Sequence, residues 1–152
     1  LSVLTDVRAR RRADEMGQLF ASALRASRDA VGIVRERDDA VLAVNEAWEA
    51  ATGLPRARQV GRPWRALGVW RDAGEVRAFA ESLAAHGRVR ELPCTLRHPD
   101  DGRRVHTLLS AERVAVDGEP CLLVVAADVT AQRQLEAMLR QSQKMEAIGQ
   151  LT

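Results

Sequence analysis

Three side chains in the second half of the 152-residue sequence are of the types that bind transition metals: Cys94, His98 and His106. Alternation along a predicted strand at residues 89–98 places Cys94 and His98 on the same face. Four residues of about 3.3 Å each separate them by about 13 Å, whereas zinc ligands lie about 2.0–2.3 Å from the ion. His106, on the next predicted strand, does not repair this geometry. The spacing predicts no metal site, and we interpret all three histidines, His86 included, as ordinary surface or hairpin residues.

Catalytic constellations are not apparent in the sequence either. It contains no glycine-rich phosphate loop, and no cluster of serine, histidine and an acid indicates a nucleophilic triad. We therefore predict no catalytic residue in this chain and a non-enzymatic role.

Large apolar side chains are the remaining candidates for a binding site. Aromatic walls with few polar groups suit planar ligands, but the same side chains more often fill a hydrophobic core, and a filled core is the interpretation we favour. The candidate pocket residues are Ile33, Trp48, Trp64, Trp70, Phe79, Leu83 and Leu96.

Composition indicates one folded domain with extensions. The chain is 46% hydrophobic and 29% charged, which suits a real core inside a water-exposed surface. A net charge of +2 provides no bulk attraction for nucleic acid. Two cysteines are too few for a disulfide scaffold and are typical of a reducing cytoplasm. No apolar run approaches the roughly 20 residues that span a bilayer, although a longer parent protein could still be attached to a membrane.

Periodicity and turn signals predict an α+β domain with a five-stranded antiparallel sheet and helices on one face. Helix caps are expected at Asn45 and Gly53 and again at Asp72 and Gly87. Asp117-Gly118 is a strong signal for a short hairpin. The predicted strands are residues 30–34, 40–44, 89–98, 104–116 and 121–127.

The last predicted strand runs directly into a long amphipathic helix. The turn is Asp128-Val129-Thr130, where Thr130 or Asp128 can cap the helix with its side-chain oxygen. The helix then carries a weak stripe with alternating steps of three and four residues, the heptad spacing of a two-helix seam. The stripe positions are Leu135, Met138, Ser142, Met145, Gly149 and Thr152.

Several of these motifs resemble those of PAS sensor domains. Asp128-Val129-Thr130 resembles the Asp-x-Thr motif that closes the family's last strand, and Val44-Asn45-Glu46-Ala47-Trp48 resembles its strand-to-helix signature. The order of elements also matches. The resemblance implies a PAS domain at residues 29–130, with its helices on the inner sheet face and with Asp128 and Thr130 as the signal-transmission residues. An N-terminal helix carrying Leu19, Phe20, Ala23 and Leu24 is expected to cover the outer face.

The end of the chain resembles a second family. Gln-Lys-Met-Glu-Ala-Ile-Gly-Gln-Leu-Thr, at residues 143–152, is similar to the opening of the dimerisation helix of bacterial sensor histidine kinases. The resemblance implies a regulatory module coupled to a kinase core in the same parent chain and, through it, to a response regulator. Residues 131–152 would be a coiled-coil linker into that helix. A ligand-free dimerisation and spacing module, or a PAS domain attached to another effector, are the alternatives.

The first 28 residues repeat the pattern of the C-terminal segment. Residues 1–16 match residues 123–138 at seven positions without a gap. We therefore expect residues 1–7 to be the tail of an upstream PAS-like domain and residues 8–28 to be its linker helix. Both terminal helices are expected to pair in a parallel homodimer. The predicted dimer contacts are Met16, Leu19, Phe20, Ala23, Leu135, Met138 and Met145.

Cofactors of the PAS family are tested against individual positions. Photosensory members bind flavin through a cysteine in the segment that corresponds to residues 61–67, and this chain has none there, so the resemblance implies no covalent flavin. Haem members use a histidine inside the helix that corresponds to residues 72–86. His86 is the only candidate and stands at the end of that helix, so haem is not expected. A non-covalent flavin or another small-molecule ligand stays open, and the cofactor is unknown.

Overall fold

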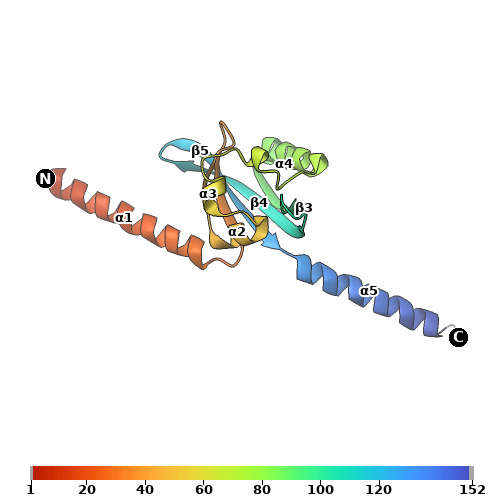
Figure 1. The fold of residues 1–152 in the computed structure, drawn as a ribbon. Coiled ribbons are helices and arrows are strands. Elements are labelled where there is room, and N and C mark those ends of the chain that lie inside the picture. Colours follow the sequence, from red (N-terminus) through yellow and green to blue (C-terminus); the bar gives the residue numbers. More distant parts are fainter. Residues whose placement is uncertain (1, 151–152) are drawn as a thin grey trace.

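A five-stranded antiparallel sheet forms the centre of the molecule, with strand order β2-β1-β5-β4-β3 (Figure 1). The computed structural model describes residues 2–150, without the side chains of Ser2 and Phe20. The predicted α+β fold, with a helix at each end, is confirmed. The elements are α1 (Ser2–Ala26), β1 (Ala30–Arg35), β2 (Val41–Val44), α2 (Glu46–Thr52), α3 (Arg56–Gln59), the 3₁₀ helix η1 (Trp64–Leu67), α4 (Ala73–His86), β3 (Arg88–Arg97), β4 (Arg104–Val116), β5 (Glu119–Asp128) and α5 (Thr130–Gln150).

The β4–β5 hairpin fixes the register of the half of the sheet that leads to α5. Asp117 and Gly118 have φ values of 51° and 76°, the paired positive angles of a tight two-residue turn. From this turn the strands pair without a bulge as far as Thr107 opposite Asp128. The end of β5 is therefore held beside a defined part of β4.

Local caps set the limits of α2 and α4 as the sequence predicts. Asn45 Oδ1 accepts a hydrogen bond from Trp48 N, and Asp72 Oδ1 accepts one from Glu75 N. Gly53 and Gly87 end the two helices with φ values of 73° and 71°. These positive angles are sterically costly for a residue with a Cβ atom.

The core lies between one face of the sheet and the segments from α2 to α4. Trp48, Trp64 and Phe79, from three different helical segments, pack with side chains of the central strands. A smaller cluster joins Leu54 and Val69 to the end of β3. The buried residues of the main cluster are Val34, Phe79, Val89, Cys94, Leu109, Ala111, Leu122 and Val124.

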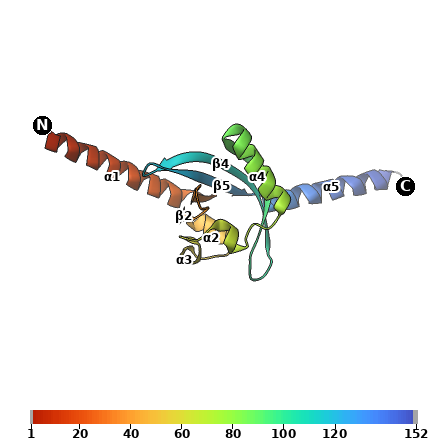
Figure 2. The ribbon, with the colours of Figure 1, turned by 90° about the horizontal axis from the view of Figure 1, so that it is seen from above.

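Helices α1 and α5 extend away from the domain in both views (Figures 1 and 2). Helix α1 does not cover the outer sheet face of its own chain through Leu19 and Ala23, which are exposed, whereas Leu24 is half-buried and the side chain of Phe20 lies outside the described residues. On β5, Leu122, Val124 and Ala126 are buried, and on the other face Cys121 is buried while Leu123, Val125 and Ala127 are half-buried. A single chain therefore covers the inner face of the sheet more completely than the outer one.

The N-terminal segment is helical from Ser2, although residues 1–7 are similar in sequence to residues 123–129, most of which lie in β5. Helix α1 already includes Ser2–Val7. A strand is stabilised by hydrogen bonds to a neighbouring strand, and in the described part of the chain the sheet consists of β1 to β5. Leu1 lies outside the described residues, and the assignment of residues 1–7 to an upstream domain stays a prediction.

Candidate functional site

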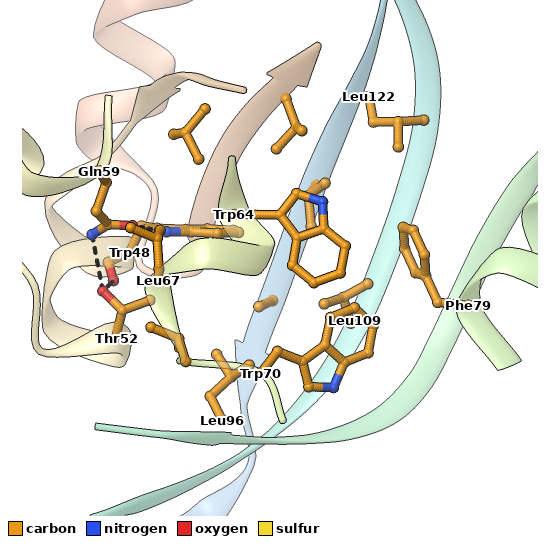
Figure 3. A pocket seen from close by; sticks show the side chains of 15 residues that line it. Trp48, Thr52, Gln59, Trp64, Leu67, Trp70, Phe79, Leu96, Leu109 and Leu122 are labelled. Carbon is orange, nitrogen blue, oxygen red and sulfur yellow. Dashed lines mark hydrogen bonds between the residues drawn. The ribbon is translucent and has the colours of Figure 1, made fainter. Parts of the chain in front are cut away.

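An apolar cavity of about 60 Å³ lies between the helical segments and the sheet (Figure 3). It is bounded by α2, η1 and α4 on one side and by β1, β4 and β5 on the other. Five of the predicted pocket residues line it: Trp48, Trp64, Trp70, Phe79 and Leu96.

The other two predicted residues do not line the cavity. Successive side chains of a strand point to opposite sheet faces, and Val34, the neighbour of Ile33, faces the cavity. Ile33 is buried but belongs to the opposite face. Leu83 lies on α4, one turn beyond Phe79, and packs against the main core cluster. Both residues therefore serve packing outside the cavity.

A buried hydrogen-bond network closes one end of the cavity (Figure 3). Trp48 Nε1 donates to Gln59 Oε1 at 2.9 Å. Gln59 Nε2 donates to Thr52 Oγ1 at 3.0 Å and to Leu54 O at 2.9 Å. Gln59 has no exposed surface. Gln59 satisfies the indole of a predicted pocket residue, and no sequence pattern predicted this role.

Aromatic rings form the opposite wall. The ring centroids of Trp64 and Trp70 are 5.5 Å apart, and Trp70 meets Phe79 edge to face at the same distance. Trp70 Nε1 donates to Glu75 Oε1 at 3.1 Å, and the guanidinium of Arg65 lies 4.7 Å from the Trp64 ring centre. The packed rings hold the wall in one arrangement, since such pairs contribute about 0.5–1.5 kcal/mol beyond burial.

The cavity does not fit a flavin or haem. Pockets for drug-sized ligands have volumes of about 300–1,000 Å³, far above the 60 Å³ found here. Every fully buried side-chain nitrogen and oxygen in the described part of the chain has a hydrogen-bond partner. His86, the one haem candidate, is exposed at the end of α4. The residues present therefore make a nearly filled core in which a larger ligand would require rearrangement.

Metal-binding and thiol chemistry are also restricted. Among residues 2–150, no three or more histidine, cysteine or acidic side chains form a group that could hold a metal ion. Burial, with smaller contributions from the charges of Glu75 and Asp72, raises the pKa of the Cys94 thiol to about 12. Cys94 therefore stays protonated at neutral pH, and the thiolate is the reactive form.

The junction between β5 and α5 is bound to the sheet by both predicted signal-transmission residues. Asp128 Oδ1 accepts a hydrogen bond from Thr130 N at 2.9 Å and thereby satisfies the first amide of α5. Thr130 Oγ1 has a different partner and accepts from His106 N of β4 at 3.0 Å. Val129 N donates to His106 O at 2.8 Å. His106 is therefore part of the junction, which corrects its interpretation as an ordinary surface residue.

Apolar side chains along the terminal helices lie open in the single chain. Met16, Leu19, Leu135, Met138 and Met145 are each about two-thirds exposed, and Ala23 is exposed. The side chain of Phe20 and the stripe position Thr152 lie outside the described residues. No helix within the described residues is both long and apolar enough to cross a membrane.

The family model described as PAS fold matches residues 24–134, most of the chain. This chain belongs to the PAS family. A search of curated protein sequences gives no match. PAS domains are sensory, non-catalytic modules, and we place this chain among them.

Solved structures of several proteins share the PAS fold of this chain. An RNA-binding light-oxygen-voltage receptor superposes with a TM-score of 0.68 at 19% identity, over 90% of this chain and 39% of the receptor. The PAS domain of nitrogen regulation protein NR(II) from Vibrio parahaemolyticus gives a TM-score of 0.58 at 18% identity, covering 72% of this chain and 97% of that chain. A PAS domain from a two-component sensor histidine kinase gives 0.61 at 15% identity, covering 76% and 98%. These likenesses show the fold alone.

Proposed function

We propose that this PAS domain is the regulatory sensor and signal-transmission module of a cytoplasmic or membrane-attached two-component histidine kinase. It passes a change in the sheet to α5, and through α5 to a kinase core in the same parent chain. The observation that carries this proposal is the junction itself. Only Val129 separates β5 from α5, and hydrogen bonds of Asp128 and Thr130 hold both sides of it. A displacement of β4 or β5 is therefore transmitted to the first turn of the helix.

The kinase assignment rests on the end of the chain. Residues 143–152 resemble the start of a kinase dimerisation helix, and α5 continues unbroken to Gln150. Two of the PAS domains compared above come from NR(II) and from a two-component sensor histidine kinase. In this proposal residues 1–7 end an upstream PAS-like domain, residues 8–28 are the linker helix, residues 29–130 are the sensor, and residues 131–152 lead into the kinase. A response regulator receives the phosphoryl group.

The small cavity favours a conformational signal over a bulky ligand. A site of about 60 Å³ with satisfied polar walls offers few groups to a ligand without rearrangement. A small-molecule ligand that opens the cavity, and a ligand-free spacing role, are the alternatives. Native mass spectrometry of the purified domain distinguishes them, because a retained ligand adds a defined mass.

A parallel homodimer is part of the proposal. The exposed stripes on α1 and α5 give each helix an apolar face that a single chain does not cover. The two helices lead into and out of the domain in roughly the same direction in both views (Figures 1 and 2). One twofold axis along that direction would pair both.

The test uses the full-length parent kinase with Asp128→Ala and Thr130→Val. We expect both variants to change autophosphorylation while the domain stays folded, because a lost cap costs about 0.5–2 kcal/mol against a typical stability of about 5–15 kcal/mol. Asp100→Ala is the control, since Asp100 is an exposed loop residue whose contact with Arg58 is a surface ion pair. Unchanged autophosphorylation in both junction variants would overturn the proposed function.

A further inference from the structure

We propose that the imidazole of His106 positions the first turn of α5. Its Nδ1 atom is a single acceptor that is shared by Thr95 of β3 and Arg133 of α5. The inference rests on the proposed function, because it names the residue that adjusts the helix start. His106 lies on β4, between Thr95 of β3 and Arg133 of α5. It therefore contacts the sheet and the helix through a single ring.

The tautomer of the neutral ring follows from its partners. His106 Nδ1 lies 3.3 Å from Arg133 Nη1 and 3.3 Å from Thr95 Oγ1. A guanidinium can only donate hydrogen bonds, so Nδ1 must accept and the neutral ring carries its proton on Nε2. The hydroxyl of Thr95 can donate to the same atom.

One acceptor nitrogen thus serves two donors. Neutral imidazole has a single in-plane lone pair at Nδ1, so it accepts one good hydrogen bond at a time. Ordinary N–H···O and O–H···O bonds have lengths of about 2.5–3.2 Å. Both contacts here, at 3.3 Å, exceed that range. A stronger bond from Thr95 must weaken the bond from Arg133, and the reverse also holds. The first turn of α5 therefore has two arrangements, one in which Nδ1 binds Arg133 strongly and one in which it binds Thr95 strongly.

The ring acts separately from the backbone of the same residue. His106 N and O bind Thr130 Oγ1 and the Val129 amide whatever side chain stands at 106. The ring adds the contact with Arg133, whose amide makes an early helical hydrogen bond to Val129 O at 2.9 Å. Replacement of the ring should therefore loosen the first turn without detaching the junction from β4.

Thr95 also connects this ring to the cavity wall. Its amide donates to Glu75 Oε1 at 3.0 Å, and the same oxygen accepts from Trp70 Nε1. A shift of Trp70 can therefore reach the hydroxyl of Thr95. Contiguity alone does not prove coupling, so the experiment measures the response of α5 directly.

The experiment is amide hydrogen exchange by NMR on the 152-residue chain, read at Arg133. His106→Phe should accelerate exchange roughly two- to tenfold, the range that corresponds to one hydrogen bond of ordinary net strength. His106→Asn, whose side-chain oxygen can replace Nδ1 as an acceptor, should restore a rate close to that of the wild type. Thr95→Val should slow exchange, because the lone pair then serves Arg133 alone. The amide of Gly87, bound to Leu83 O, is the control for global unfolding.

The three variants make the inference falsifiable on its own. Exchange at Arg133 that is unaffected by His106→Phe overturns it, as does acceleration by Thr95→Val. Parallel acceleration at Gly87 indicates a merely structural role and also overturns it. If the three variants behave as expected while the parent kinase is indifferent to Asp128→Ala and Thr130→Val, the positioning role stands and the proposed function fails.

Discussion

The imidazole of His98 lies so close to Gly53 that a Cβ atom at position 53 would overlap the ring atoms Cδ2 and Nε2. The ring Nε2 donates to Gly53 O at 3.1 Å, and Nδ1 accepts from the amides of Asp100 and Asp101. The end of β3 is thereby fastened to the end of α2. Glycine at position 53 serves both the positive φ of the helix end and this close approach.

Gly53→Ala should destabilise the domain more than a positive φ alone requires. Gly61 is the matched control, because its φ is 85° and a Cβ there would meet nothing within 4 Å. We expect Gly61→Ala to cost about 1–2 kcal/mol, the cost of the left-handed backbone, and Gly53→Ala to cost clearly more. Urea unfolding monitored by circular dichroism measures both.

His98→Ala in the Gly53→Ala background should recover part of the loss, since it removes the overlapping ring. Such non-additivity is expected only for residues in contact. Equal losses for the two glycine variants would show that the ring moves away freely.

Gln59→Ala should destabilise the core through unpaired polar groups. The substitution leaves the indole N–H of Trp48 without its acceptor, and a buried unsatisfied group costs about 1–3 kcal/mol. Gln134→Ala is the control, because Gln134 is exposed on α5. Thermal unfolding should show a large loss for the first variant and almost none for the second. A loss below 0.5 kcal/mol for Gln59→Ala, about the size of a surface effect, would contradict a structural role for this network.

Cys94 should resist alkylation until the domain unfolds. Its pKa of about 12, against an ordinary 9.0, lowers the thiolate fraction at pH 8 by roughly a thousandfold. Because the folded-state pKa is raised, this group favours folding fully below pH 9 and loses that effect as pH rises toward 12. Iodoacetamide labelling with peptide mapping should show slow modification in buffer and rapid modification in urea. Fast labelling of the folded domain would refute the burial argument.

Local signals predicted much of the fold because each acts over a few residues. Asn45 and Gly53 cap the two ends of α2, and Asp117-Gly118 forms the tight turn between β4 and β5. The same turn could have located His106. His106 lies eleven residues before Asp117, and Val129 lies eleven residues after Gly118. The two residues are therefore opposite each other, in continuation of the observed register.

Features that depend on tertiary packing could not be predicted from local sequence patterns. Both faces of β1 are apolar, so alternation could not decide whether Ile33 or Val34 faces the cavity. Gln59 follows no periodic pattern, and its role appears only when the fold brings it to Trp48.

Met16→Glu should convert the proposed homodimer into a folded monomer. The heptad stripe of α1 consists of Ala13, Met16, Phe20, Ala23 and Ser27. Met16 is two-thirds exposed in the single chain, so a dimer would bury it against its own copy. Loss of two such burials, about 3–6 kcal/mol, weakens association by roughly a hundredfold or more. Gln18→Glu adds the same charge to α1 outside the stripe and should leave the dimer intact.

Met138→Glu should have a smaller effect, because Ser142 and Gly149 weaken the stripe of α5. Light scattering over a concentration series measures each state, and circular dichroism confirms folding. A dimer that survives both methionine substitutions has its contact elsewhere, and a wild-type chain that stays monomeric at the highest attainable concentration would refute the terminal-helix interface.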